Sequence, residues 1–271
     1  MNKRLNLLIL LAGVIACLTN VVKAEIRSEI VSYQIDGQQF QGYLSYDDSI
    51  RHKQPGILVV HEWWGHNAYA RKRADMLAKL GYTAFALDMY GTGKLATHPD
   101  DAQKFMQATI ADMKTAEKRF NHAKQLLQNQ PSVDSNKIAA IGYCFGGGIA
   151  LHMASQRSDL SAVVSFHGSL ATKSSAQSGA IQAKILVLNG ADDPFVTTKQ
   201  ITAFKQAMQT AGAELEFVNY PGVKHSFTNP DADDFGKRFN MPLEYNAAAD
   251  KDSWQRMQLF FQKVFKATRN Q

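Results

Sequence analysis

The sequence predicts an α/β fold with a mostly parallel central sheet, helices on both faces and an N-terminal antiparallel hairpin. From residue 56 onward, strand-like runs alternate with helix-like segments. Several of the runs are continuously apolar, which is typical of strands buried on both faces. A hydrophobic content of 45% in 271 residues is enough to build a substantial core.

The hairpin is indicated by two alternating segments, 26–35 and 40–46, on either side of the turn pair Asp36-Gly37. The strands of the main sheet are expected at 56–60, 83–87, 137–141, 160–166, 184–188 and 214–220. Helices are expected at 68–80, 99–129, 145–156, 197–211 and 247–267. Residues 171–180 are expected to form a surface loop.

The long helix expected at 99–129 begins with a proline followed by two acidic residues and ends before Pro131. Its apolar residues recur at helical spacing, so we expect them to face the core. They are Phe105, Ile110, Met113, Ala116, Phe120, Ala123, Leu126 and Leu127.

The N-terminus has the pattern of a signal peptide covering residues 1–24, so the mature domain would span 25–271. Lys3 and Arg4 precede an apolar stretch, and Val22-Lys23-Ala24 places small residues at the cleavage subsites. We therefore expect an exported, periplasmic protein. Two alternatives stay open: a retained helical anchor, and lipoprotein processing at Cys17, which follows Val14-Ile15-Ala16.

The strongest functional signal is Gly142-Tyr143-Cys144-Phe145-Gly146, which follows four apolar residues. A strand, a sharp turn with a nucleophile, and a helix form a nucleophile elbow, here with cysteine in place of the usual serine. The N-terminus of the helix favours a thiolate over a thiol. Once the signal peptide is removed, Cys144 is the only cysteine, so no internal disulfide explains it.

Two loops that follow later strands supply partners for such a thiol. Gly190-Ala191-Asp192-Asp193 and Gly222-Val223-Lys224-His225 lie beyond the carboxyl ends of their strands, where catalytic groups of such sheets gather. A nucleophilic thiol needs a base, and the base needs an orienting carboxylate. We predict His225 and Asp193 for these roles, and Asp192 is the competitor for the second.

The loop after the strand 56–60 reads His61-Glu62-Trp63-Trp64-Gly65-His66. A zinc motif of the form His-Glu-x-x-His would need histidine at Gly65, so no metal is predicted. In the elbow architecture this loop supplies one oxyanion N–H, which we assign to Trp63, beside that of Phe145. Glu62 next to the pocket would oppose ionisation of a thiol, unless it is only a solvated loop residue.

Together these segments resemble the dienelactone hydrolase family of α/β-hydrolases, as does Ala86-Leu87-Asp88-Met89-Tyr90-Gly91. The resemblance covers the mature chain and implies an α/β-hydrolase fold with a triad of Cys144, Asp193 and His225. It implies that Glu62 interacts with the resting thiol and helps to activate it when substrate arrives. It also places Trp64, Tyr90 and Asn229 at substrate-contacting positions.

The sequence departs from the family at the arginines that hold a carboxylated lactone. Asn229 occupies the position of one, and the loop 91–94 contains no arginine. Lys94 and Arg238 are the basic residues that could substitute, although a point charge does not replace a bidentate fork. We therefore expect the family's mechanism with a substrate other than dienelactone.

The expected function is hydrolysis of a small-molecule ester or lactone by a monomeric enzyme without a cofactor. Acyl transfer or thioester hydrolysis by the same triad remains an alternative, as does a non-catalytic binding protein. The net charge of +6 is scattered, and no phosphate-binding glycine motif matches, which argues against nucleic-acid and nucleotide binding. No stable membrane insertion is expected unless Cys17 is lipidated.

Overall fold

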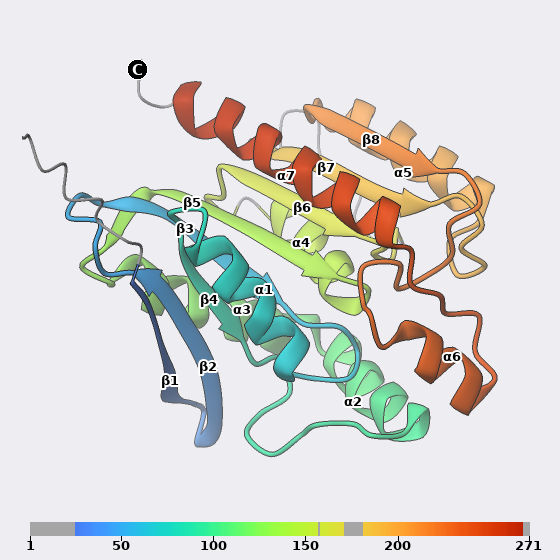
Figure 1. The fold of residues 1–271 in the computed structure, drawn as a ribbon, viewed down its shortest axis with the longest axis horizontal. Coiled ribbons are helices and arrows are strands. Elements are labelled where there is room, and N and C mark those ends of the chain that lie inside the picture. Colours follow the sequence, from blue (N-terminus) through green and yellow to red (C-terminus); the bar gives the residue numbers. More distant parts are fainter. Residues whose placement is uncertain (1–24, 157, 171–180, 268–271) are drawn as a thin grey trace, which may run out of the picture.

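The computed structural model describes residues 25–156, 158–170 and 181–267 (Figure 1). The predicted signal peptide, Cys17 and the predicted loop 171–180 lie outside these residues. Within the described part of the chain, no helix combines the length and the apolar character that crossing a bilayer requires.

The sheet formed by the described residues has eight strands in the order β1-β2-β4-β3-β5-β6-β7-β8. The hairpin strands pair antiparallel with each other, and β2 pairs antiparallel with β4, whereas all other neighbours are parallel. This confirms the predicted mixed sheet. The strands are β1 (Ile26–Ile35), β2 (Gln38–Asp47), β3 (Gln54–Val60), β4 (Thr83–Leu87), β5 (Val133–Tyr143), β6 (Ala162–Phe166), β7 (Lys184–Gly190) and β8 (Leu215–Tyr220).

The hairpin turn forms at the predicted pair. Asp36 and Gly37 have φ angles of 50° and 80°, the left-handed values that a two-residue hairpin turn requires. Aspartate and glycine tolerate these angles better than most residues. The turn therefore fixes the register of β1 on β2, in which Ile35 pairs with Gln38.

Helices cover both faces of the sheet (Figure 1). Apolar side chains of α1 (Ala68–Ala78) and α7 (Ala247–Ala267) pack in one cluster against one face. Those of α3 (Met113–Gln128), α4 (Phe145–Ser155) and α5 (Thr198–Thr210) pack in a second cluster against the other. The second face holds the helix that follows the elbow.

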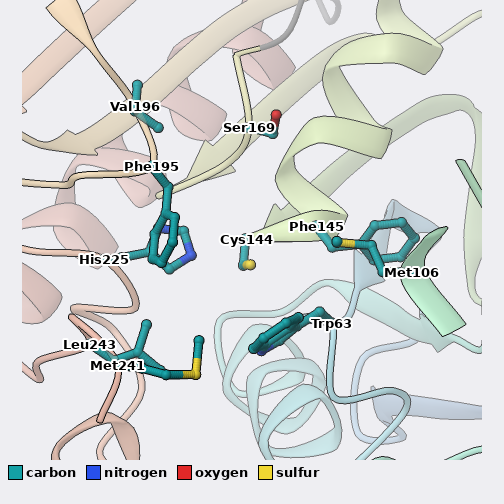
Figure 2. A pocket seen from close by; sticks show the side chains of 10 residues that line it. All are labelled: Trp63, Met106, Cys144, Phe145, Ser169, Phe195, Val196, His225, Met241 and Leu243. Atoms are coloured by element: carbon teal, nitrogen blue, oxygen red, sulfur yellow. The ribbon is translucent and has the colours of Figure 1, made fainter. Parts of the chain in front are cut away.

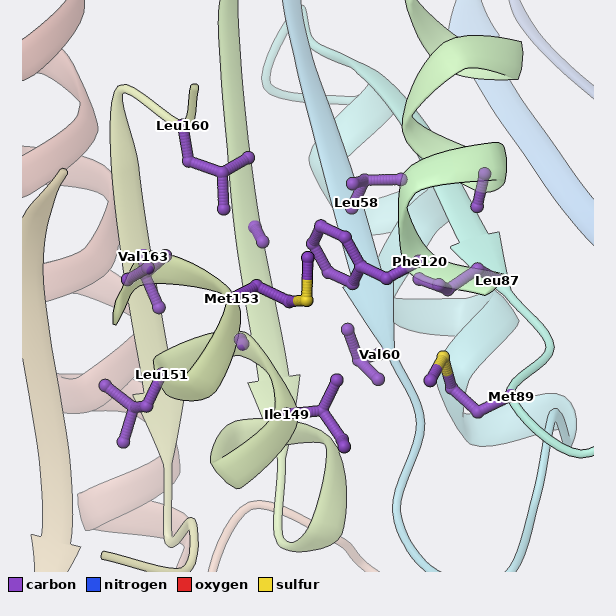
Figure 3. Close-up of a cluster of buried hydrophobic side chains, with 14 of the residues drawn as sticks. Leu58, Val60, Leu87, Met89, Phe120, Ile149, Leu151, Met153, Leu160 and Val163 are labelled. Atoms are coloured by element: carbon purple, nitrogen blue, oxygen red, sulfur yellow. The ribbon is translucent and has the colours of Figure 1, made fainter. Parts of the chain in front are cut away.

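Phe120 of α3 lies at the centre of the second cluster. Figure 3 shows its ring between Leu58 of β3 and Met153 of α4, and the side chain is fully buried. Ala116, Ala123 and Leu127 of the same helix are also buried, as their spacing predicts. This core holds α3 and α4 against the strands that end at the site.

The prediction of one helix over 99–129 is wrong at its middle. The chain forms α2 (Pro99–Ala111) and then α3, because Asp112 leaves helical geometry and its side chain accepts the N–H of Thr115 as a new N-cap. Ile110, expected in the core, is 43% exposed beside this break. A short helix, α6 (Ala232–Phe239), was not expected at all.

The topology determines where the site forms. The chain leaves β3 toward β4 on one side of the sheet and later returns to β5 on the other, so the loops after β3 and β5 diverge at a topological switch point. Ligands of such sheets bind at the carboxyl ends of strands flanking this point. Both the Glu62 loop and Cys144 lie there.

Candidate active site

Cys144 occupies the one-residue turn between β5 and α4. Its φ of 52° and ψ of −116° are sparsely populated for a residue with a side chain, and such strain is common at functional sites. Its N–H donates to the carbonyl oxygen of Phe166 on the neighbouring strand, at 3.0 Å. The sulfur therefore stands at the N-terminus of α4, where the helix dipole favours negative charge.

Two glycines make this turn possible. A Cβ on Gly142 would overlap the backbone of Gly146, and a Cβ on Gly146 would overlap the carbonyl groups of Val60 and His61. The elbow therefore brings α4 into direct backbone contact with β5 and with the end of β3. This accounts for the glycine on each side of the nucleophile position.

His225 and Asp193 are brought together as the sequence predicts. The Nδ1 atom of His225 lies 2.6 Å from Oδ2 of Asp193, and both side chains are buried. The other carboxylate oxygen of Asp193 accepts the N–H of Phe195, at 2.8 Å. Asp192 is exposed instead, so the structure selects Asp193 as the carboxylate that orients His225.

The electrostatics of His225 favour its charged form. Burial lowers the pKa of this imidazole, but the charge that Cys144 carries when ionised, the hydrogen bond to Asp193 and a hydrogen bond to Cys144 together raise it to about 10. An imidazolium beside a thiolate is the charge state that an activated cysteine requires.

Phe145 and Trp63 both line the cavity around Cys144. Phe145 is the first residue of α4, where backbone N–H groups lack intrahelical acceptors. Within the described residues, neither the N–H of Phe145 nor that of Trp63 donates a hydrogen bond. Both residues thus offer an N–H donor in the cavity that Cys144 lines.

Glu62 is buried, with 2% of its surface exposed. Its Oε2 accepts a 2.6 Å hydrogen bond from Nδ2 of Asn229, and its Oε1 accepts one of 3.3 Å from Oγ of Ser226. Burial raises the pKa of the Glu62 carboxyl, and the bonds from Asn229 and Ser226 together with the charges of His225 and Arg73 oppose that rise. Glu62 is therefore not a solvated loop residue.

A cavity of about 250 Å³ opens over Cys144. Figure 2 shows the sulfur between two walls: His225 and Phe195 on one side, Trp63 and Phe145 on the other. Phe195 is 48% exposed at this wall, and its ring meets that of His225 edge to face. The described residues that line it are Trp63, Met106, Cys144, Phe145, Ser169, Phe195, Val196, His225, Met241 and Leu243.

The three predicted substrate contacts lie outside this lining. Trp64 is buried against Phe235 of α6, with 4.5 Å between ring centroids. The hydroxyl of Tyr90 donates to the carbonyl oxygen of Trp63 at 3.1 Å. Asn229 binds Glu62. The structure thus places Trp64, Tyr90 and Asn229 behind the cavity, where they support residues of the site.

Among the described residues, the lining contains no lysine and no arginine. Lys94 is exposed, and Arg238 is exposed on α6, where its guanidinium lies 4.6 Å from the ring centroid of Phe239. Neither of these two basic residues reaches the cavity wall. Apart from Cys144, Ser169 and His225, every described lining side chain is apolar, so this part of the cavity is suited to an uncharged ligand.

The described residues contain no group of three or more His, Cys, Asp or Glu side chains placed to hold a metal ion. His61 lies near the site but its ring nitrogens bond to the backbone: Nε2 accepts the N–H of Met89 at 3.1 Å. His66 and His167 are buried as well.

Sequence reasoning did not predict most of the cavity wall. Met106 comes from α2, while Met241 and Leu243 follow α6. The helix α6 has recognisable signals, with Asp233 and Asp234 in its first turn and Asn240 in the left-handed conformation at its end. Those signals locate the helix, whereas its packing against Trp64 is what brings Met241 and Leu243 to the site.

Comparisons with known proteins agree with this geometry. A sequence profile of the dienelactone hydrolase family matches residues 40–265. The protein usf of Aquifex pyrophilus is 27% identical and aligns over 87% of this chain and 98% of its own length. Among solved structures, the dienelactone hydrolase-like promiscuous phosphotriesterase P91 from metagenomic libraries is 32% identical, with a TM-score of 0.83 over 89% of this chain and 99% of its own. A structure named m3DLH is 34% identical, with a TM-score of 0.82 over 88% of this chain and 98% of its own. The chain belongs to the dienelactone hydrolase family.

Proposed function

We propose that this protein hydrolyses uncharged carboxylic esters or lactones, with Cys144 as nucleophile. The observation that supports this most directly is the placement of three groups in one cavity. Cys144, on the elbow, and His225 line the same cavity. Oδ2 of Asp193 lies 2.6 Å from Nδ1 of His225 and orients the imidazole. Membership of a hydrolase family supports the same conclusion.

In the proposed reaction, the Cys144 thiolate attacks the carbonyl carbon. The N–H groups of Phe145 and Trp63 donate to the oxyanion that forms. The imidazolium of His225 gives its proton to the departing alkoxide, and the acyl group remains on sulfur as a thioester. Water then attacks this thioester with His225 as base, which releases the acid and regenerates the thiolate.

The uncharged lining supports a neutral substrate. A carboxylate on the substrate would lose its hydration in this cavity without a cation to replace it, because no basic side chain of the described residues reaches the wall. The apolar lining instead favours the alkyl or aryl parts of a neutral ester. Dienelactone carries a carboxylate and is therefore a poor candidate for the natural substrate.

The experiment is a matched comparison on purified residues 25–271. Neutral aryl esters and lactones are tested against analogues that differ only by an added carboxylate. We expect kcat/KM to be at least about tenfold higher for the neutral member of each pair. A preference for the carboxylated members would contradict the proposed specificity, although not the triad.

Acyl transfer and thioester hydrolysis use the same intermediate, so product analysis must separate them. An added alcohol or amine that takes the acyl group in preference to water would identify a transferase, and faster turnover of thioesters than of matched esters would identify a thioesterase. Absence of both turnover and an acyl adduct on Cys144 would favour a binding protein instead.

A second activity, hydrolysis of neutral phosphotriesters, is suggested by the 32% identity to a promiscuous phosphotriesterase. The cavity, which no lysine or arginine of the described ranges lines, also fits an uncharged triester. The thiolate would attack phosphorus, an aryloxide would leave with the proton of His225, and water would cleave the P–S bond. Continuous release of the phenol is expected. A burst of one equivalent without turnover would show that the triester only inactivates the protein.

A further inference from the structure

The structure contains a buried cation that the proposed reaction does not use. Arg73 of α1 is 3% exposed. Its Nη2 atom donates to the carbonyl oxygen of Thr228 at 2.7 Å and to Oδ1 of Asp250 on α7 at 2.6 Å. Its Nε atom donates to the hydroxyl of Tyr69 at 3.3 Å. The side chain thus joins α1, α7 and the loop after β8.

Three aromatic rings enclose this guanidinium. Its central carbon lies 5.2 Å from the ring centroid of Tyr69, 5.4 Å from that of Tyr143 and 5.2 Å from that of Trp254. A buried ion pair rarely adds stability over apolar residues of similar volume, because desolvation of the charges is costly. Stability alone therefore does not explain a buried arginine at this position.

The contact with Thr228 connects Arg73 to the site. Thr228 belongs to the turn of residues 225–229, which begins with His225 and ends with Asn229. Its Oγ1 lies 2.7 Å from the hydroxyl of Tyr69 and 2.8 Å from Nε2 of His167. Both groups that donate to Glu62, Ser226 and Asn229, lie in the same turn.

This turn is strained and needs external support. Ser226 has a φ of 59°, in the left-handed region that a residue with a side chain adopts at a cost. Arg73 and Tyr69 contact the turn at Thr228 from the face of the sheet that α1 and α7 cover, whereas α4 and its cavity-lining residue Phe145 lie on the other face.

The positive charge of Arg73 also connects it to the site, through its effect on Glu62. Arg73 and His225 are the positive groups that act on the Glu62 carboxylate among the described residues. Asp250 pairs with Arg73 and compensates part of its charge. The other titratable groups that interact with Arg73 come from α1, β5, the loop after β6 and the segment before α7. They are Tyr69, Tyr143, His167 and Tyr245.

We propose that Arg73 is a positioning residue of the active site: through its bond to Thr228 it holds the 225–229 turn, which carries His225 and both donors to Glu62. In this way one side chain outside the cavity sets the place of His225, and its positive charge also acts on the Glu62 carboxyl. The inference rests on the proposed function only in assuming that His225 and Glu62 act on Cys144.

The test uses two substitutions that are expected to shift the titration of the Glu62 carboxyl in opposite directions. In Arg73→Met a positive charge that acts on Glu62 is lost, so the titration of the Glu62 carboxyl should move to higher pH. In Asp250→Asn the compensating negative charge is lost, so the same titration should move to lower pH. Carbon-13 NMR of the side-chain carboxyl carbon, assigned with Glu62→Gln, measures both shifts.

Turnover provides the second measurement. Arg73→Met should lower kcat for a neutral ester by about tenfold or more, with KM changed by less than about threefold, because His225 shifts while the apolar side chains of the cavity stay in place. In Arg73→Lys the titration of Glu62 should stay as in the wild type, because lysine keeps the positive charge. The kcat should be only partly retained, because the lysine ammonium cannot reproduce the planar set of N–H donors of the guanidinium. Lys72→Met, an exposed neighbour on α1, is the matched control.

Thermal unfolding confirms that each variant is folded under the assay conditions. If Arg73→Met does not fold, Arg73→Lys and Asp250→Asn still decide the question. Wild-type Glu62 titration in both Arg73→Met and Asp250→Asn would overturn the charge role, and wild-type kcat in folded Arg73→Met would overturn the positioning role. If the wild-type protein turns over no ester, the proposed function fails, yet the NMR titration still tests Arg73.

Discussion

The amide of Asn229 donates a 2.6 Å hydrogen bond to the buried carboxylate of Glu62. With the bond from Ser226, both carboxylate oxygens of Glu62 have donors from the turn that begins with His225. The carboxyl group of Glu62 is therefore tied to the same turn that carries His225, the proposed general base.

Glu62→Gln should change the reactivity of the thiol. Removing a buried negative charge near Cys144 makes thiolate formation easier, so alkylation by iodoacetamide near neutral pH should become faster. Ester turnover should fall if the carboxylate helps to take the thiol proton when substrate binds. Alkylation rate against pH and hydrolysis of a neutral lactone, measured on one preparation, test both effects. Wild-type values for both would show that Glu62 takes no part in activating Cys144.

The proposed triad predicts that substitution of any one of its three members strongly lowers kcat. Cys144→Ala, Asp193→Asn and His225→Ala should each lower kcat by at least about 100-fold, because groups that act as a unit fail together. A double variant should lose little more than the worse single one. Steady-state assays on a neutral aryl ester measure this, and Asp192→Asn is the matched control. Substantial turnover by folded Cys144→Ala would show that another group is the nucleophile.

The sequence predicted those parts of the site that depend on local sterics. The elbow could be predicted because Gly142 and Gly146 are required by the backbone contacts on each side of Cys144. Parallel strands bring their carboxyl ends to one edge, so loops far apart in sequence could be assigned to one site. That reasoning does not separate Asp193 from its competitor Asp192 in the same loop, and the structure buries Asp193, the predicted one, against His225.

Other features of the fold and the site depend on tertiary packing, which the neighbouring residues in the sequence do not reveal. A helix-compatible apolar pattern continues across residue 112, yet Asp112 caps a second helix there, since an aspartate side chain competes for backbone N–H groups. The cavity wall at Met241 depends on α6 packing against Trp64. The donors of Glu62 also lie more than 160 residues away in sequence.

The core at α3 predicts a large stability effect at one residue. Phe120→Ala removes a fully buried ring between β3 and α4 and should lower the free energy of unfolding by about 3–5 kcal/mol. Urea denaturation measures the change. Ile110→Ala, at an exposed position beside the break between α2 and α3, should stay within about 0.5 kcal/mol of wild type. Equal losses in the two variants would contradict the packing of Figure 3.

The pattern of residues 1–24 predicts export, with a mature chain that begins at Glu25. Small residues stand at both cleavage subsites, Val22 and Ala24. Intact mass and N-terminal sequencing of natively exported protein measure the terminus. A diacylated Cys17 would instead identify lipoprotein processing, and an uncleaved chain in the membrane fraction would identify a retained anchor.

The pairing of His225 with Cys144 predicts how the imidazole titrates. Its pKa of about 10 is raised above the usual 6.5, and the thiolate charge is the largest raising cause, so Cys144→Ala should lower this pKa. Because the folded pKa is raised, the stabilisation by the charged imidazole is complete below pH 6.5 and is lost as pH rises through about 10. The difference in unfolding free energy between wild type and Cys144→Ala should therefore shrink across this window. Imidazole NMR titration and urea denaturation measure the two effects, with Met241→Leu as the uncharged cavity control. An unchanged His225 titration in Cys144→Ala would mean that no thiolate stands beside the imidazole in the resting protein.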